Sequence, residues 1–378
     1  MNRNLALDGL RGYAAITVVF FHSILFLKPN YNNNILNTSL LHISRGTDIQ
    51  SKILMTIFNG QLAVAFFFLL SGVVLFQSLD KNKQLGFFAT ITNFSVKRIA
   101  RIYPTLILYL LLFFGTFQIL QYIPHYMPPL GNSSAYESLI NNSLLYNSNL
   151  SAQTWTLQLE VFAIPFMLLG FYGYKLLGVS GLFIFLAYAL LSFENPWLTF
   201  NIPVINAYLF LFALGFFIPT QIGKQIFSLF KSSDCILLFF LALMVRQIFP
   251  FQDLLLLLVQ GMFIFLFVGV IYHHPTGIVY RFLTHKYSLY FGKISYSFYL
   301  YNWLFLTAIE RTLMFFVLPF KFYFKSGLLM AILTIVITIP FAHLSEKYIE
   351  RPFRNLKFIR NFRTRGTFKA YPVAVGEE

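Results

Sequence analysis

The sequence predicts an all-α protein, a bundle of about ten helices that span a membrane. Apolar residues make up 57% of the 378 residues and charged residues only 11%, whereas a soluble domain carries about 25% charged residues. The apolar residues gather in segments of about 20, the length that crosses about 30 Å of hydrocarbon. These two observations exclude a water-soluble globular protein and a disordered chain.

Ten segments fit this length. The fifth and seventh are the weakest, because the fifth is short and the seventh contains Arg246. The loops at 28–55 and 122–154 are rich in Asn and Ser, and we expect short helical pieces in them. The predicted spans are 8–27, 56–79, 102–122, 155–173, 177–192, 200–219, 234–250, 254–272, 288–309 and 326–345.

The positive charges between the segments predict the orientation. With the N-terminus inside, 21 of the 28 Lys and Arg residues fall on the inner side, as the positive-inside rule requires. Both termini are then cytoplasmic, and the basic tail at 355–378 contacts anionic headgroups. The net charge of +15 therefore reflects membrane topology, and no separate basic domain indicates nucleic acid. The single cysteine, Cys235, allows no internal disulfide.

The first helix places two functional side chains on one face. Arg11 and His22 are eleven residues apart, which is three turns plus about 20°, and His22 lies about 16 Å deeper. Imidazole is the usual general base near neutral pH. A histidine bonded to a neighbouring helix is the alternative interpretation.

Two further motifs lie on the second and third helices. Arg98 and Arg101 are at positions i and i+3, so they share a face, and paired guanidinium groups suit phosphate oxygens. They equally fit a positive anchor at the inner boundary. Ser71 and Gly72 fit either a small-residue packing notch or a hydroxyl that lines a ligand channel.

Carboxylates appear near both ends of the bundle. Glu160 lies about 9 Å inside the fourth span and needs a partner there. His22 reaches a similar depth, and a pair would orient the imidazole, but the sequence leaves open whether these helices touch. At the last helix we expect Glu350 to pair with Arg351, and Pro352 to end the helix. No group of residues has metal-ligand spacing, so no metal is expected.

Six motifs, taken in order, resemble the acyltransferase 3 family of integral membrane acyltransferases. The resemblance runs from residue 7 to residue 354, and it makes 1–354 the family domain and 355–378 a separate tail. Three departures are Asn302 in place of a frequent His, Val73 in place of Phe and Val161 in place of Glu. The motifs are LDGLR at 7–11 with His22, FLLSG at 68–72, RIARIYP at 98–104, WTLQLE at 155–160, ISYSFYL at 294–300 and YIERPF at 348–353.

The resemblance implies a reaction and its residues. Such proteins take an acyl group, commonly acetyl, from cytoplasmic acyl-CoA and pass it to a hydroxyl of a sugar, often in a bacterial surface glycan. It implies acetyl-CoA as donor, a carbohydrate acceptor, no metal, and a bacterial inner membrane. Arg11 and His22 match the essential pair of the family. The implied catalytic residues are His22, Arg11 and Glu160, and the implied donor-binding residues are Arg98, Arg101, Ser71 and Tyr103.

A transporter or flippase of glycans or lipids is the alternative, because buried Arg, His and Glu also suit a proton-coupled carrier. The sequence contains no internal repeat and no pair of interrupted helices, which are the features that would favour a carrier. Affinity for CoA from the cytoplasmic side distinguishes the two classes.

Overall fold

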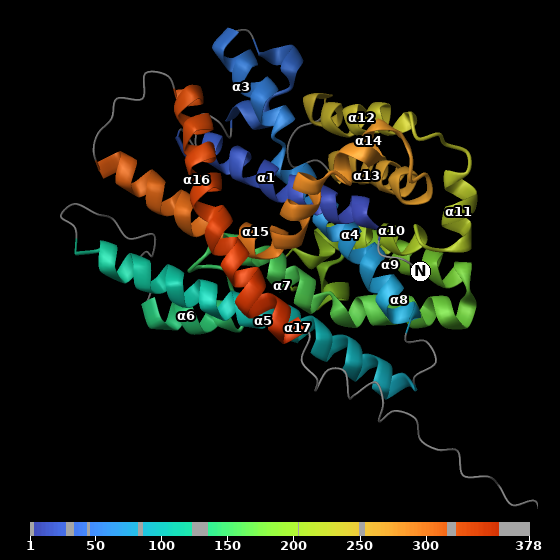
Figure 1. Ribbon diagram of the computed structural model, residues 1–378. Helices are drawn as coiled ribbons and strands as arrows, with labels where there is room; N and C mark the ends of the chain where they lie inside the picture. Colours follow the sequence, from blue (N-terminus) through green and yellow to red (C-terminus); the bar gives the residue numbers. More distant parts are fainter. Residues whose placement is uncertain are drawn as a thin grey trace, which may run out of the picture.

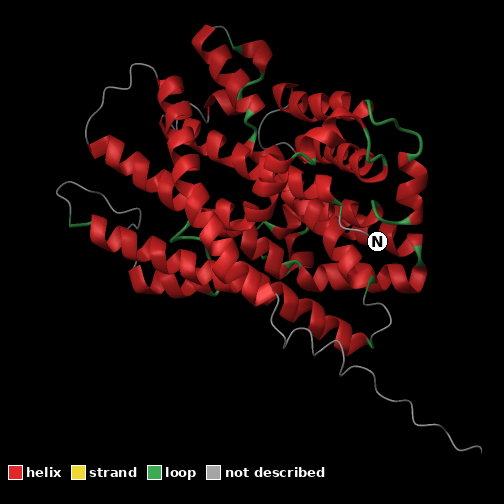
Figure 2. Cartoon of the chain, viewed as in Figure 1, coloured by secondary structure: helices red, strands yellow, loops and turns green. Residues whose placement is uncertain are grey.

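Helices account for all the regular secondary structure of the described residues in a computed structural model, and no strand occurs among them (Figure 2). The described residues are 4–27, 34–43, 46–81, 86–122, 135–202, 204–248, 254–315 and 323–354. The predicted basic tail at 355–378 lies outside them. The longer helices are α1 (Leu5–Leu27), α4 (Gly60–Asp80), α5 (Phe87–Leu120), α13 (Leu254–His273), α15 (Lys286–Phe315) and α16 (Tyr323–Ser345).

Shorter helices connect and flank these long ones (Figure 1). Two of them, α3 and α6, lie in the loops where short helical pieces were expected, and this prediction is confirmed. The shorter helices are α3 (Gly46–Ile57), α6 (Ala135–Ser143), α7 (Trp155–Phe162), α8 (Ile164–Leu177), α9 (Val179–Glu194), α10 (Ile205–Phe217), α11 (Gln221–Phe227), α12 (Asp234–Ile248), α14 (Gly277–Leu283) and α17 (Arg351–Arg354).

Each of the ten predicted spans overlaps a helix of the described residues, but fewer qualify as spans by length and apolar composition. Six described segments do so, and a seventh if α10 and α11, bent by 87°, count as one. α9 and α12 are short, and α15 is 30 residues long but polar. The polytopic helical bundle is confirmed, and the number ten stays a prediction. The six are Leu5–Phe26, Asp48–Asp80, Phe87–Leu120, Ala152–Leu177, Leu255–His273 and Ser326–Arg354.

Close backbone contacts fix α1 against α15. A Cβ atom at Gly292 would lie 2.2 Å from the Asp8 carbonyl oxygen, and one at Gly12 would lie 2.6 Å from the Gly292 nitrogen. Small residues allow helix backbones to approach this closely in membranes. The glycines around Arg11 therefore hold the start of α1 on α15 and fix the position from which Arg11 extends.

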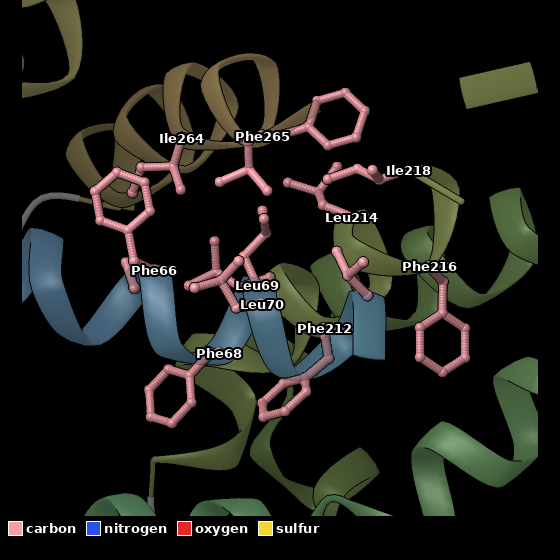
Figure 3. Packing of buried hydrophobic residues seen from close by; sticks show 14 of the residues in the cluster. Phe66, Phe68, Leu69, Leu70, Phe212, Leu214, Phe216, Ile218, Ile264 and Phe265 are labelled. Atoms are coloured by element: carbon pink, nitrogen blue, oxygen red, sulfur yellow. The ribbon is translucent and has the colours of Figure 1, made fainter. Parts of the chain in front are cut away.

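A second close approach joins α4 to α10. A Cβ atom at Gly72 would lie 2.5 Å from the Phe212 carbonyl oxygen, and one at Gly215 would lie 2.4 Å from that of Leu69. The packing notch predicted at Gly72 is therefore present. Figure 3 shows side chains of α4 facing those of α13 on one side and those of α10 on the other. Labelled there are Phe66, Phe68, Leu69, Leu70, Phe212, Leu214, Phe216, Ile218, Ile264 and Phe265.

The end of the bundle differs from the predicted arrangement. Arg351 binds Glu346 at 2.8 Å, and Glu350 lies 3.6 Å from Arg354, so the predicted Glu350–Arg351 pair is wrong. Neighbours on a helix point about 100° apart and do not face each other. A π-helical turn, η4 (Glu346–Glu350), interrupts the helix, and α17 runs through Pro352. The prediction that Pro352 ends the helix is also wrong, because proline is tolerated in a first helical turn.

Candidate active site

Five helices, α1, α4, α5, α7 and α15, meet around a cavity of about 60 Å³, here named the arginine pocket. It brings together Arg11, Ser71, Arg98, Arg101 and Glu160, five of the seven site residues that the sequence predicts. These residues lie up to 149 positions apart in the chain. The full lining is Arg11, Phe67, Phe68, Ser71, Val74, Arg98, Arg101, Ile102, Thr156, Leu157, Glu160, Ser295, Tyr296 and Tyr299.

A buried ion pair crosses the pocket. The Arg98 Nη2 atom donates to the Glu160 Oε2 atom at 2.7 Å, and the Ser71 hydroxyl donates to Oε1 at 3.0 Å. The Arg98 side chain is only 6% exposed. Both oxygens of Glu160 are therefore engaged, and the carboxylate holds Arg98 in place. The predicted alternative, a pair between Glu160 and His22, does not form.

The other two arginines are held less firmly. The Arg11 Nη2 atom donates to the Leu70 carbonyl oxygen at 3.3 Å, and Nη1 lies 3.6 Å from the Asp8 carboxylate. Arg101 has no hydrogen bond or ion pair with any residue in the described part of the chain. Its guanidinium is thus available to an anionic ligand. The predicted shared face of Arg98 and Arg101 is confirmed, since both line the same pocket.

Two wider cavities adjoin the arginine pocket and share Arg101 with it. One has a volume of about 220 Å³ and is named the basic cavity; the other has about 410 Å³ and is named the mixed-charge cavity. Among the charged residues of each lining, cations outnumber carboxylates. The basic cavity is lined by Val74, Leu75, Ser78, Phe94, Lys97, Arg98, Arg101 and Arg354. The mixed-charge cavity is lined by Asn4, Leu7, Asp8, Arg11, Val74, Gln77, Ser78, Lys81, Arg101, Gly292, Lys293, Ser295, Tyr296, Glu350 and Arg354.

His22 lies on α1 beyond the arginine pocket. Its ring meets the Trp303 ring edge-on at a centroid distance of 5.0 Å, and the Phe21 and Phe26 rings lie beside it. Its Nδ1 atom is buried and has no hydrogen-bond partner among the described residues. An imidazole nitrogen without a partner remains able to accept a proton from a bound ligand.

The polar face of α15 links the pocket to His22. Tyr299 lines the arginine pocket, and Trp303 follows one helical turn later on the same face. The Tyr299 hydroxyl accepts a hydrogen bond from Thr156 at 3.1 Å. Tyr299 belongs to the motif at 294–300, but no role could be assigned to it from the sequence, because the direction of its side chain depends on how α15 packs.

The remaining predicted residue, Tyr103, lies elsewhere. It packs against the apolar cluster around Leu106 and Tyr109 and lines none of the three cavities. Asn302, the departure from the common His, is fully buried. Its amide donates to the Phe298 and Tyr299 carbonyl oxygens and accepts from Gln153 at 2.9 Å. Asn302 thus joins α15 to the segment before α7.

A separate cavity of about 470 Å³ lies on another face of α1 and is lined almost entirely by apolar side chains. It contains Tyr13, Thr17 and Cys235 but no charged residue among those described. The described residues also hold no group of three or more His, Cys, Asp or Glu side chains placed for a metal ion. The chemistry of the described part of the chain is therefore concentrated at the arginine pocket and at His22.

These features define a polytopic helical membrane protein with a basic, polar pocket among its helices. The model of the acyltransferase 3 family, described as an acyltransferase domain, matches residues 4–344. The chain belongs to this family. No curated protein and no solved structure matches the chain.

Proposed function

We propose that the protein is an O-acyltransferase that moves an acyl group, acetyl by family resemblance, from cytoplasmic acyl-CoA to a sugar hydroxyl. The observation that carries the proposal is that Arg11, Arg98 and Arg101 meet in the arginine pocket, which adjoins the basic cavity and the mixed-charge cavity. Guanidinium groups bind phosphate oxygens through parallel hydrogen bonds. A transferred acyl group then needs a general base, and His22 supplies one.

The donor fits the cavities by charge. The phosphates of CoA would lie against the cations of the two wider cavities. One of these cations, Arg101, lines both cavities and has no hydrogen-bond or ion-pair partner among the described residues. The pantetheine arm would follow α1 from Arg11 toward His22, a rise of about 16 Å for eleven residues. Tyr299 and Trp303 lie along this path on α15.

In the proposed transfer step, His22, Arg11 and Glu160 each have one role. The acceptor hydroxyl oxygen attacks the thioester carbonyl carbon, the C–S bond breaks, and CoA leaves as a thiolate. His22 takes the hydroxyl proton and returns it to the thiolate sulfur. Arg11 stabilises negative charge at the inner end of the path, while Glu160 positions Arg98 because both of its oxygens are engaged.

The proposal includes location and acceptor. We place the protein in a bacterial inner membrane, with ten spans and cytoplasmic termini. In this orientation acyl-CoA would reach the basic cavity and the mixed-charge cavity from the cytoplasm, and a surface glycan or its lipid-linked precursor would approach from the opposite side. The distribution of Lys and Arg between the segments supports this orientation.

The test compares His22→Gln with the wild-type protein in membranes supplied with labelled acetyl-CoA and a glycan acceptor. An amide retains hydrogen bonding but cannot take a proton, so transfer should fall about 100-fold or more while CoA binding persists. His285→Gln is the matched control, because His285 is exposed and lines none of the cavities described above. Near-normal transfer by His22→Gln would refute the role of His22, and a wild-type protein without CoA affinity would refute the proposed function.

A further inference from the structure

We propose that Lys97 and Arg354 form a subsite for a phosphate monoester, the 3′-phosphate on the ribose of the CoA donor. This inference rests on the proposed function and deepens it. It concerns the basic cavity alone, between α4, α5 and α17, and assigns a ligand group to two residues that the sequence motifs left without a role.

The lining of the basic cavity distinguishes it from its neighbour. Four of its eight lining residues are cations, and none of the described residues that line it is a carboxylate. The mixed-charge cavity also carries cations, but Asp8 and Glu350 line it. A phosphate monoester carries between about 1.5 and 2 negative charges at pH 7, and it binds best where no carboxylate competes or repels.

Two buried carboxylates hold the Arg354 side chain in place. Its Nη1 atom lies 3.6 Å from the Glu350 carboxylate and its Nη2 atom 3.9 Å from the Glu346 carboxylate. Both carboxylates are almost fully buried, whereas the Arg354 side chain is 42% exposed. A guanidinium has five N–H donors, so at least three remain for a ligand. The π-helical turn η4 brings the two carboxylates to one side, and such turns occur often at functional sites.

The two wider cavities match the two phosphate groups of CoA. They share Arg101 and Arg354, so they are adjacent. The diphosphate belongs in the mixed-charge cavity, because that cavity also contains Arg11, from which the path along α1 begins. The monoester, which branches from the ribose, then falls in the basic cavity beside Lys97 and Arg354. Arg98 contributes less there, since it is buried and lies 2.7 Å from Glu160, whereas Arg354 is more exposed and lies 3.6 Å or more from its two carboxylates.

The experiment measures binding of CoA and of 3′-dephospho-CoA to the purified full-length protein in nanodiscs. The wild-type protein should bind CoA at least about tenfold more tightly, the effect of one or more charge-assisted hydrogen bonds. Lys97→Gln should remove most of this difference by weakening CoA binding, and leave the affinity for 3′-dephospho-CoA within about twofold, because Lys97 lines the basic cavity and not the mixed-charge cavity. Arg354→Gln should weaken the binding of both ligands, because Arg354 lines both cavities, and should weaken CoA binding more.

Arg351→Gln is the matched control. Arg351 is also 42% exposed and binds the same Glu346 carboxylate, but it lines neither wider cavity, so both affinities should stay unchanged. Equal wild-type affinities for the two ligands would overturn the subsite. An equal loss of both affinities in Lys97→Gln, or in Arg354→Gln, would also overturn it. A wild-type protein that binds neither ligand would overturn the proposed function itself, a result distinct from the other two.

Discussion

Neutralising Glu160 should destabilise the protein more than its small change in shape suggests. Glu160→Gln keeps the volume of the side chain and an acceptor for the Ser71 hydroxyl, but it removes the charge that faces Arg98 at 2.7 Å. Because Arg98 is only 6% exposed, its guanidinium would remain buried without a counter-charge.

The magnitude follows from the burial. Removing one partner of a buried ion pair costs about 3–5 kcal/mol because it leaves an uncompensated buried charge, and replacing both partners leaves no such charge. We therefore expect Glu160→Gln to lower the free energy of unfolding by about 3 kcal/mol or more. The double variant Arg98→Gln/Glu160→Gln should recover most of this loss.

The assay is denaturant unfolding of the protein in detergent micelles for the wild type, both single variants and the double variant. The four values form a double-mutant cycle, and its coupling energy isolates the interaction between the two side chains. Asp80→Asn serves as a control, since it removes a carboxylate at the end of α4 that lines none of the three cavities.

Two results would refute this reasoning. If Glu160→Gln is as stable as the wild type, the buried Arg98 guanidinium does not need Glu160 as its counter-charge. Losses that simply add in the double variant would mean that the two side chains do not interact, and that Glu160 is free for another role, including the contact with His22 that the sequence left open.

Three further predictions follow from the packing and the charge distribution. Gly292→Ala should lower the melting temperature, because its Cβ atom would lie 2.2 Å from the Asp8 carbonyl oxygen. Overpacking of this kind costs about 1–3 kcal/mol or more. Gly115→Ala is the control and should leave the melting temperature unchanged, because the space around a Cβ atom at Gly115 is open. Asn302→Leu should cost about 1–3 kcal/mol in unfolding free energy, because the Gln153 amide loses its buried acceptor; an unchanged value would contradict the role given to Asn302. Reporter fusions after residue 378 and within 80–95 should report cytoplasm, and a fusion within 130–145 the outer side; an external C-terminus would contradict the ten-span topology.

Within single helices the sequence was a reliable guide except at the end of the bundle, where the predicted Glu350–Arg351 pair and the predicted helix end at Pro352 are wrong. Composition and segment length predict a helical membrane protein, and all ten predicted spans overlap helices of the described residues. Helical periodicity places Arg98 and Arg101 on one face, and both line the arginine pocket. These features depend on residues a few positions apart, so the 3.6-residue repeat determines them without reference to the rest of the chain.

Partners between helices were decided only by the tertiary structure. Glu160 faces Arg98 and Ser71. Glu346, which the sequence analysis gave no role, lies 3.5 Å from Lys293 of α15. Depth along a helix narrows the possible partners, but the rotation and neighbours of each helix depend on packing throughout the bundle. Backbone contacts at Gly12 and Gly292 set that packing for α1 and α15. A linear sequence shows that a buried carboxylate needs a cation, and only the folded bundle determines which cation it meets.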